Sequence, residues 1–444
     1  MSEPVLFYGL KAKYVTFGCK LNFAETSTIG RMLADHGILT AEEGETPDVI
    51  VVNTCSVTSV ADRKCRQYIR TLNRTYPDAA IAVTGCYAQL KPDEVMALPG
   101  VVLVFGNDRK NELPEMLADW VERRAERMAV VRAKDFRTFE PSCSRGDRTR
   151  YFLKVQDGCN YFCSYCAIPY ARGRSRSPRI ESLVAQAEQA AREGGKEIVL
   201  TGVNIGEFGS DHDESLLDLI RALDKVEGIE RYRISSIEPN LLTDDIIEFV
   251  ASSKKFMPHF HIPLQSGADE VLRLMRRHYD TALFGEKIRR VRERIPDAFI
   301  GVDLIVGMRG ETEALFEKSA RFVEDLDITR LHVFPYSERE ATAALSITPV
   351  VDKEERRSRA RHMIGISDAK EKAFSERYAS TVRPVLLETF DPATGDMTGH
   401  TDNYIKVKIS GGSEDMINKI VPVRLGEVVE HPEGFYSIAE AENE

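Results

Sequence analysis

Short apolar runs alternate with amphipathic stretches over the first 140 residues or so of the chain. The apolar runs are rich in β-branched residues and bounded by Gly, Pro or Asp, which is typical of strands. The strands predicted in this way cover residues 13–17, 48–53, 80–84 and 101–105. Amphipathic stretches such as 22–36 and 59–76 lie between them and predict helices. This alternation indicates a parallel sheet with helices on both faces.

A strand-then-helix pattern repeats about six times between residues 145 and 375. The strands expected here are 151–156, 197–200, 232–235, 259–264, 299–306 and 331–335. The helices expected here are 179–193, 214–226, 284–294, 313–326 and 353–374. Repeated right-handed β/α units curl toward a barrel that carries its chemistry at the strand C-termini. Six units instead of eight predict an incomplete (β/α)6 barrel, open on one side to a large substrate.

From about residue 380 the pattern changes to short alternating or apolar runs separated by turns. Strands are expected at 382–390, 403–409, 420–425 and 435–439. Turn residues stand between them, at Asp391, Gly411 and Pro432. This pattern predicts a small antiparallel β-barrel. The chain is therefore expected to be an α/β protein of three domains, which span residues 1–140, 141–375 and 376–444.

The composition indicates where the protein is expected to be located and what its net charge implies about partners. The 444 residues are 43% hydrophobic, which is enough for real cores, yet no apolar run approaches the ~18 residues of a membrane span. The N-terminus shows no signal-peptide pattern, and eight cysteines in so long a chain indicate metal or redox ligands in a reducing cytoplasm. The net charge of −10 gives no general signal for nucleic acid, so any RNA contact must come from local basic patches.

Three cysteines, Cys159, Cys163 and Cys166, stand within eight residues at the spacing C-x3-C-x2-C. Three thiolates can hold three irons of a cubane cluster and leave the fourth iron open, which separates a reactive metal centre from a closed structural one. Aromatic residues within the stretch would shield such a cluster from water. The alternative is a zinc knuckle that lacks a ligand, but no second cysteine pair or His follows at a zinc spacing.

Three further cysteines, Cys19, Cys55 and Cys86, each follow the C-terminal end of a predicted strand. Such ends share one edge of a parallel sheet, so we expect these distant residues to converge in space. Convergence favours a second cluster over the alternative of three unrelated small core residues. Cys65 falls within a predicted helix and Cys143 within a polar linker, and both are expected to be non-ligands because neither has a partner at ligand spacing.

The C-x3-C-x2-C stretch, with an aromatic residue before its last cysteine, resembles the signature of the radical S-adenosylmethionine enzymes. Over its whole length, the chain resembles the methylthiotransferases, which combine an N-terminal cluster domain, a radical S-adenosylmethionine barrel and a C-terminal TRAM β-barrel. The stretches that carry this resemblance are Phe17-Gly-Cys-Lys-Leu-Asn22, Asn53-Thr-Cys-Ser-Val-Thr58, Thr84-Gly-Cys86, Gly158-Cys-Asn-Tyr-Phe-Cys-Ser-Tyr-Cys166, His261-Ile-Pro-Leu-Gln-Ser-Gly267, His332-Val-Phe-Pro-Tyr-Ser337 and Gly399-His-Thr-Asp-Asn-Tyr404.

Within that family, three stretches look most like the branch that acts on N6-threonylcarbamoyladenosine beside the tRNA anticodon. They are Gly18-Cys-Lys-Leu-Asn22, Asn53-Thr-Cys-Ser-Val-Thr58 and Leu200-Thr-Gly-Val-Asn-Ile-Gly206. The resemblance then implies a tRNA-modifying enzyme that adds a methylthio group at C2 of this base. Three alternatives stay open: methylthiolation of isopentenyladenosine in tRNA, methylthiolation of a ribosomal-protein aspartate, and a non-catalytic iron–sulfur redox or RNA-sensing module.

The resemblance also implies the cofactors and partners. The cofactors are two [4Fe–4S] clusters and S-adenosylmethionine. The catalytic cluster would be held by Cys159, Cys163 and Cys166. The second cluster, on Cys19, Cys55 and Cys86, would carry the sulfur. The implied partners are the anticodon stem-loop of tRNA and an electron donor such as flavodoxin or ferredoxin, with the protein acting as a monomer and without a membrane.

We expect S-adenosylmethionine to bind at polar groups beside the cluster and at the strand ends. These candidates are Tyr165, Thr201, Asn204, Ser236 and Gln265. The alternative for each is an ordinary strand-end or capping residue. The substrate-binding candidates lie in or near the quoted stretches, and they are Lys20, Asn22, Arg172, Arg174, Arg176 and Arg339.

Arginines are concentrated just after the catalytic cysteines, and arginine suits phosphate better than lysine does. The arginine runs at 289–294 and 356–361 are interleaved with Glu and are expected to be solvated helix faces. The C-terminal region is acidic, so any RNA contact there would use a local face with Tyr404, Lys406 and Lys408. Two loops depart from the family pattern, in the stretches Met308-Arg-Gly-Glu-Thr312 and Arg339-Glu-Ala-Thr342, which leaves substrate contacts on the active rim open.

Overall fold

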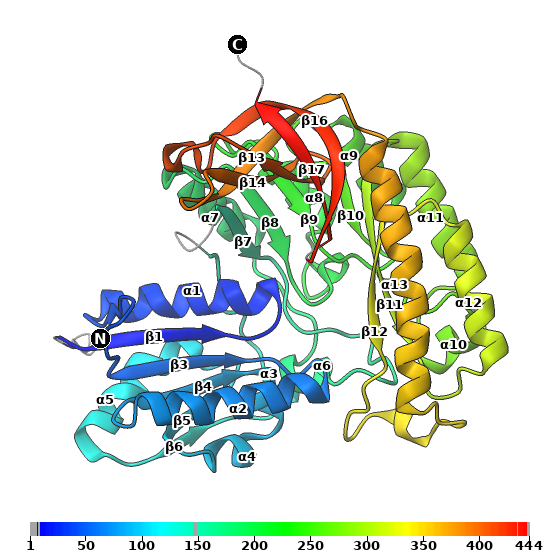
Figure 1. Ribbon diagram of the computed structural model, residues 1–444. Coiled ribbons are helices and arrows are strands. Elements are labelled where there is room, and N and C mark those ends of the chain that lie inside the picture. The colour runs from blue at the N-terminus through cyan, green and yellow to red at the C-terminus, as the bar shows by residue number, and fades with distance from the viewer. Residues whose placement is uncertain (1–6, 8, 145–148, 433, 442–444) are drawn as a thin grey trace.

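The computed structural model describes residues 7, 9–144, 149–432 and 434–441. It contains a parallel N-terminal sheet, an open barrel of β/α units, called the half barrel below, and a small closed C-terminal barrel, in chain order (Figure 1). The predicted α/β class and the three kinds of sheet are confirmed. None of the helices in the described ranges is long and apolar enough to cross a membrane.

Six strands form the N-terminal sheet, all parallel, in the order β2-β1-β3-β4-β5-β6. Their bounds are β1 (Lys11–Thr16), β2 (Leu39–Thr40), β3 (Val49–Thr54), β4 (Ala80–Gly85), β5 (Val101–Phe105) and β6 (Arg127–Ala129). Strands β3 and β4 are buried along their whole length. This burial is the reason that both read as continuous apolar runs rather than alternating ones.

Helices cover both faces of this sheet (Figure 1). One face carries α1 (Lys20–Asp35) and α5 (Leu113–Arg123), whose apolar residues share a core with Val51 and Leu103. The other face carries α2 (Ser59–Thr75), α3 (Cys86–Leu90) and α4 (Pro92–Met96), whose apolar residues share a core with Val52 and Val83. The cysteine-bearing loops are therefore held at the edge of a sheet that is packed on both sides.

Two three-stranded parallel sheets make up the half barrel. They are β7-β8-β9, with β7 (Arg150–Lys154), β8 (Glu197–Thr201) and β9 (Arg231–Ile234), and β10-β11-β12, with β10 (His259–His261), β11 (Phe299–Val306) and β12 (Arg330–Pro335). Parallel bridges from Tyr232 to Phe256 and from Ser236 to His261 join the two sheets into one curved wall. The predicted six-stranded incomplete barrel is therefore confirmed.

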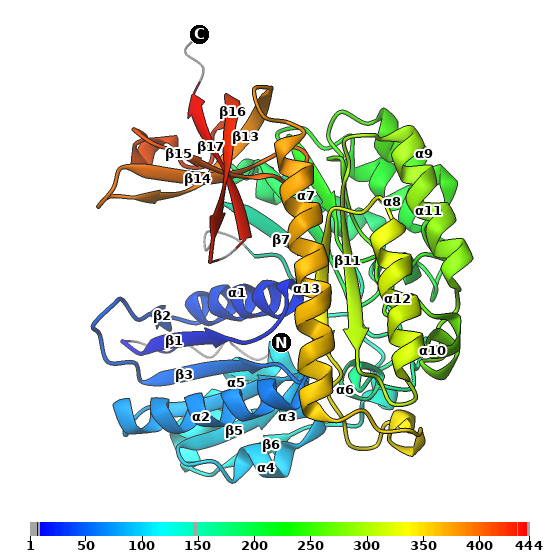
Figure 2. The same cartoon turned by 45° about the vertical axis from the view of Figure 1, so that its right-hand side comes forward.

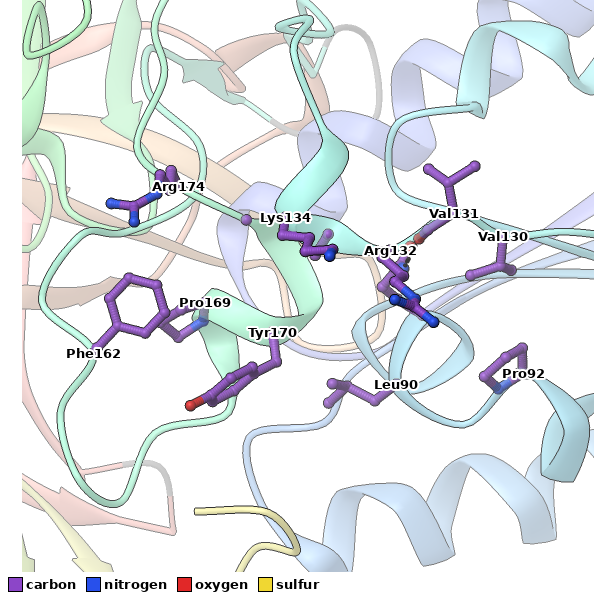
Figure 3. Close-up of a pocket in the computed structure, with 13 residues that line it drawn as sticks. Leu90, Pro92, Val130, Val131, Arg132, Lys134, Phe162, Pro169, Tyr170 and Arg174 are labelled. Carbon is purple, nitrogen blue, oxygen red and sulfur yellow. Dashed lines mark hydrogen bonds between the residues drawn. The ribbon is translucent and has the colours of Figure 1, made fainter. Parts of the chain in front are cut away.

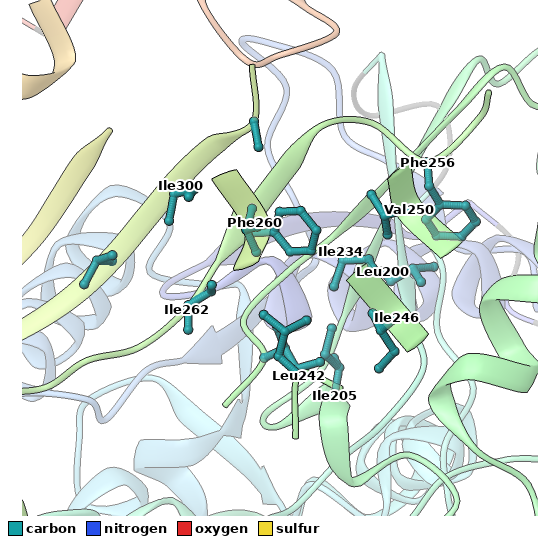
Figure 4. Packing of buried hydrophobic residues seen from close by; sticks show 14 of the residues in the cluster. Leu200, Ile205, Ile234, Leu242, Ile246, Val250, Phe256, Phe260, Ile262 and Ile300 are labelled. Carbon is teal, nitrogen blue, oxygen red and sulfur yellow. The ribbon is translucent and has the colours of Figure 1, made fainter. Parts of the chain in front are cut away.

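Helices line the outside of this wall (Figure 2). Their bounds are α7 (Ile180–Arg192), α8 (Leu216–Leu223), α9 (Asp244–Ser252), α11 (Thr281–Arg294), α12 (Glu313–Asp325) and α13 (Lys353–Glu376), and the short α6 (Ile168–Arg172) and α10 (Asp269–Leu274) lie at the strand C-termini. Aliphatic and aromatic side chains from strands and helices, among them Leu200, Ile234, Phe260 and Ile300, pack into one continuous core (Figure 4).

Five strands close the C-terminal barrel in the order β13-β14-β15-β17-β16. They are β13 (Val382–Asp391), β14 (Asp396–Thr401), β15 (Lys406–Ile409), β16 (Ile420–His431) and β17 (Gly434–Ala441). The barrel is antiparallel, as predicted, except at one seam, where β15 and β17 pair in parallel. Strand β14 was not predicted, since its polar sequence Asp-Met-Thr-Gly-His-Thr carries little strand signal.

The C-terminal barrel is docked on the N-terminal ends of the half-barrel strands. The Arg233 guanidinium donates to the carbonyls of Thr401 and Asp402, both at 2.8 Å. Its Nε donates to the Glu197 carboxylate, also at 2.8 Å. Arg231 donates to the Pro384 carbonyl at 2.8 Å. Because these charged groups are buried, their hydrogen bonds fix the C-terminal barrel firmly at this end of the wall.

Tyr404 lies at the centre of this docking surface. Its ring lies 4.8 Å from the Arg233 guanidinium, 4.5 Å from the His259 ring and 5.4 Å from the Phe299 ring. Its hydroxyl accepts a hydrogen bond from Arg150 at 3.1 Å. The expectation that Tyr404 contributes to an RNA-binding face is therefore wrong, because residues of the half barrel already contact its ring and its hydroxyl.

The N-terminal sheet lies across the open side of the half barrel. Helix α1 packs beside β7 at one margin of the opening. At the other margin, in the loop after β12, Arg339 pairs with Asp62 of α2 at 2.8 Å, and the Ser337 hydroxyl accepts from the Ser59 amide at 3.1 Å. The large opening that the six-unit pattern predicts is thus covered by another part of the same chain.

Replacing Arg233 with Met should lower the stability of the docked assembly. The change removes a hydrogen-bond donor from the buried Glu197 carboxylate and from two carbonyls. The free energy of unfolding should fall by about 3–5 kcal/mol. Thermal unfolding followed by circular dichroism, together with limited proteolysis between the half barrel and the C-terminal barrel, measures the effect. Lys196→Met, which removes only the exposed pair with Glu230, is the matched control and should change little. An equal midpoint for both variants would contradict the docking role.

Candidate active site

Cys19, Cys55 and Cys86 lie together at one edge of the N-terminal sheet, just beyond β1, β3 and β4. Gly18 and Gly85 have φ of 102° and 95°, so the chain turns sharply before two of them. The loops touch, because a Cβ on Gly18 would lie only 2.8 Å from the Cys55 Cβ. Burial and, to a smaller extent, the neighbouring thiols of Cys86 and Cys19 together raise the pKa of Cys55 to about 12. The strand-end argument thus places these three thiols correctly.

Cys159, Cys163 and Cys166 lie in the loop that follows β7, at the C-terminal end of the half barrel. Burial raises the pKa of all three, to about 12 for Cys166, and neighbouring thiols contribute to the raised pKa of Cys159 and Cys166. Their sulfurs accept hydrogen bonds: two backbone amides donate to Cys159 and Cys166 at 3.5 Å, and the Arg277 guanidinium donates to Cys163 at 3.0 Å. Donors aimed at sulfur stabilise thiolates, so this loop fits an iron–sulfur cluster.

Neither set of cysteines resembles a site for a single metal ion. Among the described residues, no three His, Cys, Asp or Glu side chains converge closely enough to ligate one ion. In a cubane cluster each thiolate binds a different iron, so the ligands stand around the cluster instead of converging on a point. Cys65 and Cys143, expected to be non-ligands, are buried with their sulfurs near backbone carbonyls, at 3.8 Å from Cys55 and 3.6 Å from Ser144.

Polar groups at the strand ends near the cysteines lack protein partners. Both side-chain amide atoms of Asn204 are buried, and neither has a hydrogen-bond partner within the described residues. The same holds for the Asn53 side-chain oxygen and the Thr84 hydroxyl, which stand just before the Cys55 and Cys86 loops. A buried polar atom without a partner is costly, so these positions fit groups that receive a ligand.

The remaining cofactor candidates occupy the inner surface of the half barrel. The Ser236 hydroxyl is hydrogen-bonded to His261 Nδ1 at 2.9 Å, and His261 Nε2 to Asp303 at 2.9 Å. Gln265 has a left-handed φ of 66°, which is strained for a residue with a side chain. Thr201 is buried at the end of β8, and Tyr165 packs on the small apolar cluster beside the catalytic cysteines. Their roles in cofactor binding stay predictions.

Three residues of this site, Asp303, Glu238 and Arg277, belong to none of the stretches that carry the family resemblance, whereas their neighbour His332 opens one of them. Asp303 and His332 stand on β11 and β12, and the His332 ring lies 5.2 Å from that of His261. Burial, together with the neighbouring His261, lowers the pKa of His332 to about 4, so His332 is neutral at physiological pH. Glu238 pairs with Arg277, which in turn holds Cys163. For Asp303 and Glu238 the available signal was only that a polar residue interrupts an apolar strand or follows one, and Arg277, in the loop after α10, carried no such signal.

Arg172 is not a phosphate contact. Its side chain is 1% exposed, and its guanidinium pairs with Glu25 at 2.9 Å and with Asp157 at 3.1 Å. Its Nε donates to the Cys86 sulfur at 3.3 Å, and Nη2 donates to the Asn22 side-chain oxygen at 2.7 Å. The backbone of Arg172 therefore lies at the end of α6, shortly after the catalytic cysteines, and its side chain reaches a cysteine of the other set.

Three other substrate candidates are also occupied by the protein itself. Asn22 is buried and donates to carbonyls of Phe17 and Thr54, so it ties two cysteine loops together. Arg176 is buried and pairs with Asp157 at 3.3 Å. Arg339 is buried against Asp62. The structure gives no support to the prediction that these side chains bind substrate, because groups of the protein itself already engage each of them.

Lys20 and Arg174 remain candidates for substrate binding. Lys20 lies where the three parts of the chain meet, since Tyr404, Arg150 and Glu197 all influence its pKa, which burial lowers. Arg174 is exposed, and its guanidinium lies 5.7 Å from the Phe162 ring.

The two departures from the family pattern have local structural roles. Arg309 pairs with Glu338 at 2.8 Å across the rim. Ala341 has a φ of 61°, a left-handed conformation that glycine adopts freely and alanine does not.

Two family models match the chain. The model of the Radical SAM superfamily matches residues 153–323, and that of the uncharacterized protein family UPF0004 matches residues 11–106. Among solved structures, the radical S-adenosylmethionine methyltransferase TsrM from Kitasatospora setae is similar in fold, with a TM-score of 0.54 at 16% identity over 73% of this chain and 74% of its own. The fold and the cysteine loop thus define a radical S-adenosylmethionine enzyme.

Sequence relatives extend over nearly the whole chain. Threonylcarbamoyladenosine tRNA methylthiotransferase MtaB of Bacillus subtilis is 40% identical over 92% of each chain, and that of Aquifex aeolicus is 35% identical over 93% of this chain and 100% of its own. The tRNA-2-methylthio-N(6)-dimethylallyladenosine synthase of Carboxydothermus hydrogenoformans is 29% identical over 93% of this chain and 96% of its own. The chain belongs to the radical S-adenosylmethionine methylthiotransferase family, which implies a [4Fe–4S] cluster and S-adenosylmethionine as cofactors.

Replacing Arg172 with Met should destabilise the protein before any cluster is loaded. The free energy of unfolding should fall by about 3–5 kcal/mol, because the buried carboxylates of Glu25 and Asp157 each lose one of their cationic partners. Burial alone would raise the pKa of Glu25, but Arg172, Lys110 and Lys154 hold it well below 4.5. The stabilisation is therefore complete above about pH 4.5 and disappears on acidification, and the variant should unfold at a higher pH than the wild type.

Urea and acid unfolding of the cluster-free protein measure this effect. Arg179→Met is the control from the same arginine run, since Arg179 forms only an exposed pair with Asp213. Its unfolding should match that of the wild type. Equal unfolding of both variants would show that the buried ion pairs do not hold the two sheets together.

Proposed function

We propose that the protein is a tRNA-modifying enzyme that methylthiolates C2 of N6-threonylcarbamoyladenosine beside the anticodon. The observation that carries this proposal is that relatives named for this modification reach 34–40% identity over about nine-tenths of the chain. Relatives named for the dimethylallyladenosine reaction stand at 29–30% over a similar length, which makes that substrate the second candidate.

The arrangement of the cysteines supports two clusters. We assign Cys159, Cys163 and Cys166 to the catalytic [4Fe–4S] cluster and the other triad, at the edge of the N-terminal sheet, to a second [4Fe–4S] cluster. When bound, the clusters and S-adenosylmethionine supply the one-electron and sulfur chemistry needed to replace a hydrogen on an unactivated aromatic carbon. Arg172 supports this pairing because it spans the distance between the two cysteine loops.

The chain's own residues then have distinct tasks. Arg277 donates to the Cys163 sulfur and is held by Glu238. Asn204 offers S-adenosylmethionine an amide that has no partner among the described residues, and Ser236 and Gln265 follow the C-terminal ends of β9 and β10. We place the N-terminal cluster domain in residues 1–140, the radical barrel in 141–375 and a TRAM-like domain in 376–444. The anticodon stem-loop, a flavodoxin or ferredoxin as electron donor and a monomeric cytoplasmic enzyme complete the proposal.

Iron content and cofactor cleavage test the two clusters separately. Anaerobically reconstituted protein should hold about eight irons, as two four-iron clusters require. A variant with Ser at 19, 55 and 86 should hold about half, still cleave S-adenosylmethionine when reduced, and transfer no sulfur. The matched variant with Ser at 159, 163 and 166 should also hold about half but should not cleave it. Full iron content in either variant would remove that triad from the assignment.

The substrate is tested with three synthetic anticodon stem-loops that differ only at the target adenosine. The stem-loop with N6-threonylcarbamoyladenosine should gain a methylthio group, detected by mass spectrometry of its nucleosides. Stem-loops with isopentenyladenosine or unmodified adenosine should not react, because pocket groups made for the polar threonyl substituent would be left unpaired. Equal turnover of the isopentenylated stem-loop would refute the proposed substrate and leave the methylthiotransferase chemistry in place.

A further inference from the structure

A pocket of about 620 Å³ opens beside the catalytic cysteines, between their loop and the N-terminal sheet (Figure 3). We call it the junction pocket. Phe162, Pro169 and Tyr170 form one wall, and Leu90 and Val131 belong to the opposite side. Its volume lies within the range of small-molecule sites. Apart from Phe162, an aromatic residue of the catalytic cysteine stretch, and the substrate candidate Arg174, none of the residues that line it has been assigned to the clusters, the cofactor or the substrate.

The aromatic wall is presented to solvent by a strained backbone. Phe162 stands between Cys159 and Cys163 and has a left-handed φ of 49°, which is unusual for an aromatic residue. Tyr170 is 52% exposed, and the two rings meet edge to face with centroids 6.1 Å apart. A strained residue at a functional loop indicates a geometry that the surrounding structure maintains. Here that geometry keeps two rings at the mouth of a cavity.

The charges around the pocket have one sign. Arg132, Lys134 and Arg174 line it and are exposed, and no carboxylate pairs with them in the part of the chain that the structure describes. Asp135 is acidic and adjacent in sequence but does not line the pocket. In a chain of net charge −10, where Arg172, Arg176 and Arg179 of the neighbouring run are all ion-paired, three unpaired cations at one cavity are distinctive.

We propose that the junction pocket binds one nucleotide of the anticodon loop that flanks the modified adenosine. Its base would stack on Tyr170 and Phe162, and its phosphates would lie against Arg132, Lys134 and Arg174. Stacking on aromatic rings combined with unpaired cations is the usual way to hold single-stranded RNA. This inference rests on the proposed tRNA function and adds the site that holds the loop open.

The position of the pocket explains why a flanking nucleotide fits better than the target. Leu90 ends the helix that begins at Cys86, and Phe162 stands within the catalytic loop, so the pocket adjoins both cysteine sets without containing a cysteine. An enzyme that works on a base within a structured loop must take that base out of its stack. Holding its neighbour in a separate pocket keeps the displaced base from returning.

Affinity for the stem-loop with N6-threonylcarbamoyladenosine, measured by fluorescence anisotropy over a range of salt concentrations, tests the proposal. Tyr170→Ala should raise the Kd about tenfold by removing a stacking ring. The double variant Arg132→Ala, Lys134→Ala should weaken binding and reduce the slope of log Kd against log salt by about 1.4, as expected for two contacts to single-stranded phosphates. Cofactor cleavage without RNA should be unchanged in both, because these side chains lie outside the cluster and cofactor sites.

The double variant Arg221→Ala, Lys254→Ala is the control, since both residues are exposed cations away from the pocket, and it should keep the wild-type affinity and salt slope. As a second measurement, 5-iodouridine placed at each loop position in turn should crosslink to Tyr170 or Phe162 from a position beside the target. Wild-type affinity and slope in the Tyr170 and Arg132/Lys134 variants, with crosslinks mapped elsewhere, would overturn the proposal.

Two further outcomes separate this inference from its alternatives. If the pocket variants bind RNA normally but need more reduced flavodoxin for cofactor cleavage, while dithionite supports full activity, the pocket docks an electron carrier and the RNA assignment is wrong. If the wild type modifies the isopentenylated stem-loop instead, the proposed substrate is wrong. The affinities and salt slopes of the variants still decide whether the junction pocket binds RNA.

Discussion

A buried cluster of charges between the N-terminal sheet and the half barrel sets the geometry on which the site depends. Two carboxylates, Glu25 and Asp157, share ion pairs with Lys110, Lys154, Arg172 and Arg176. Burial lowers the pKa of Lys110 to about 8, against the attraction of Glu25, because the neighbouring cations add to the cost of its charge. This excess of positive charge, with Arg172 donating to the Cys86 sulfur, is complementary to an anionic thiolate-bound cluster.

The same constraint explains the overall arrangement in Figure 1. The charge cluster fastens the N-terminal sheet to the β7 margin of the half barrel, and the pair of Arg339 and Asp62 fastens it to the β12 margin. The C-terminal barrel closes the opposite end of the strands around Tyr404. With these sides covered, the cysteine loops lie at the C-terminal ends of the strands of both sheets, and Arg172 links the two regions through its contacts with Cys86 and Asp157.

The sequence was sufficient for most of the elements and for the placement of the six cysteines, and insufficient for the partners of the buried charges. Apolar runs end where buried strands end, so the six cysteines could be placed beyond strand ends from pattern alone. Arg172 was misread because its partner Glu25 is 147 residues away, and nothing local distinguishes a buried arginine from a phosphate-binding one. Strand β14 and the seam between β15 and β17 were missed because pairing across a small barrel decides them, not local propensity.

Backbone strain is concentrated on the rim where these parts meet. Phe162, Gln265 and Ala341 all have left-handed φ values, in three loops that surround the strand ends. Each such residue costs free energy, so each loop must be held by contacts elsewhere. Arg339 supplies them for the Ala341 loop, since its carbonyl accepts from Thr342 at 2.7 Å while its guanidinium is paired with Asp62. The rim is therefore a preformed surface, and binding energy from RNA need not be spent on ordering it.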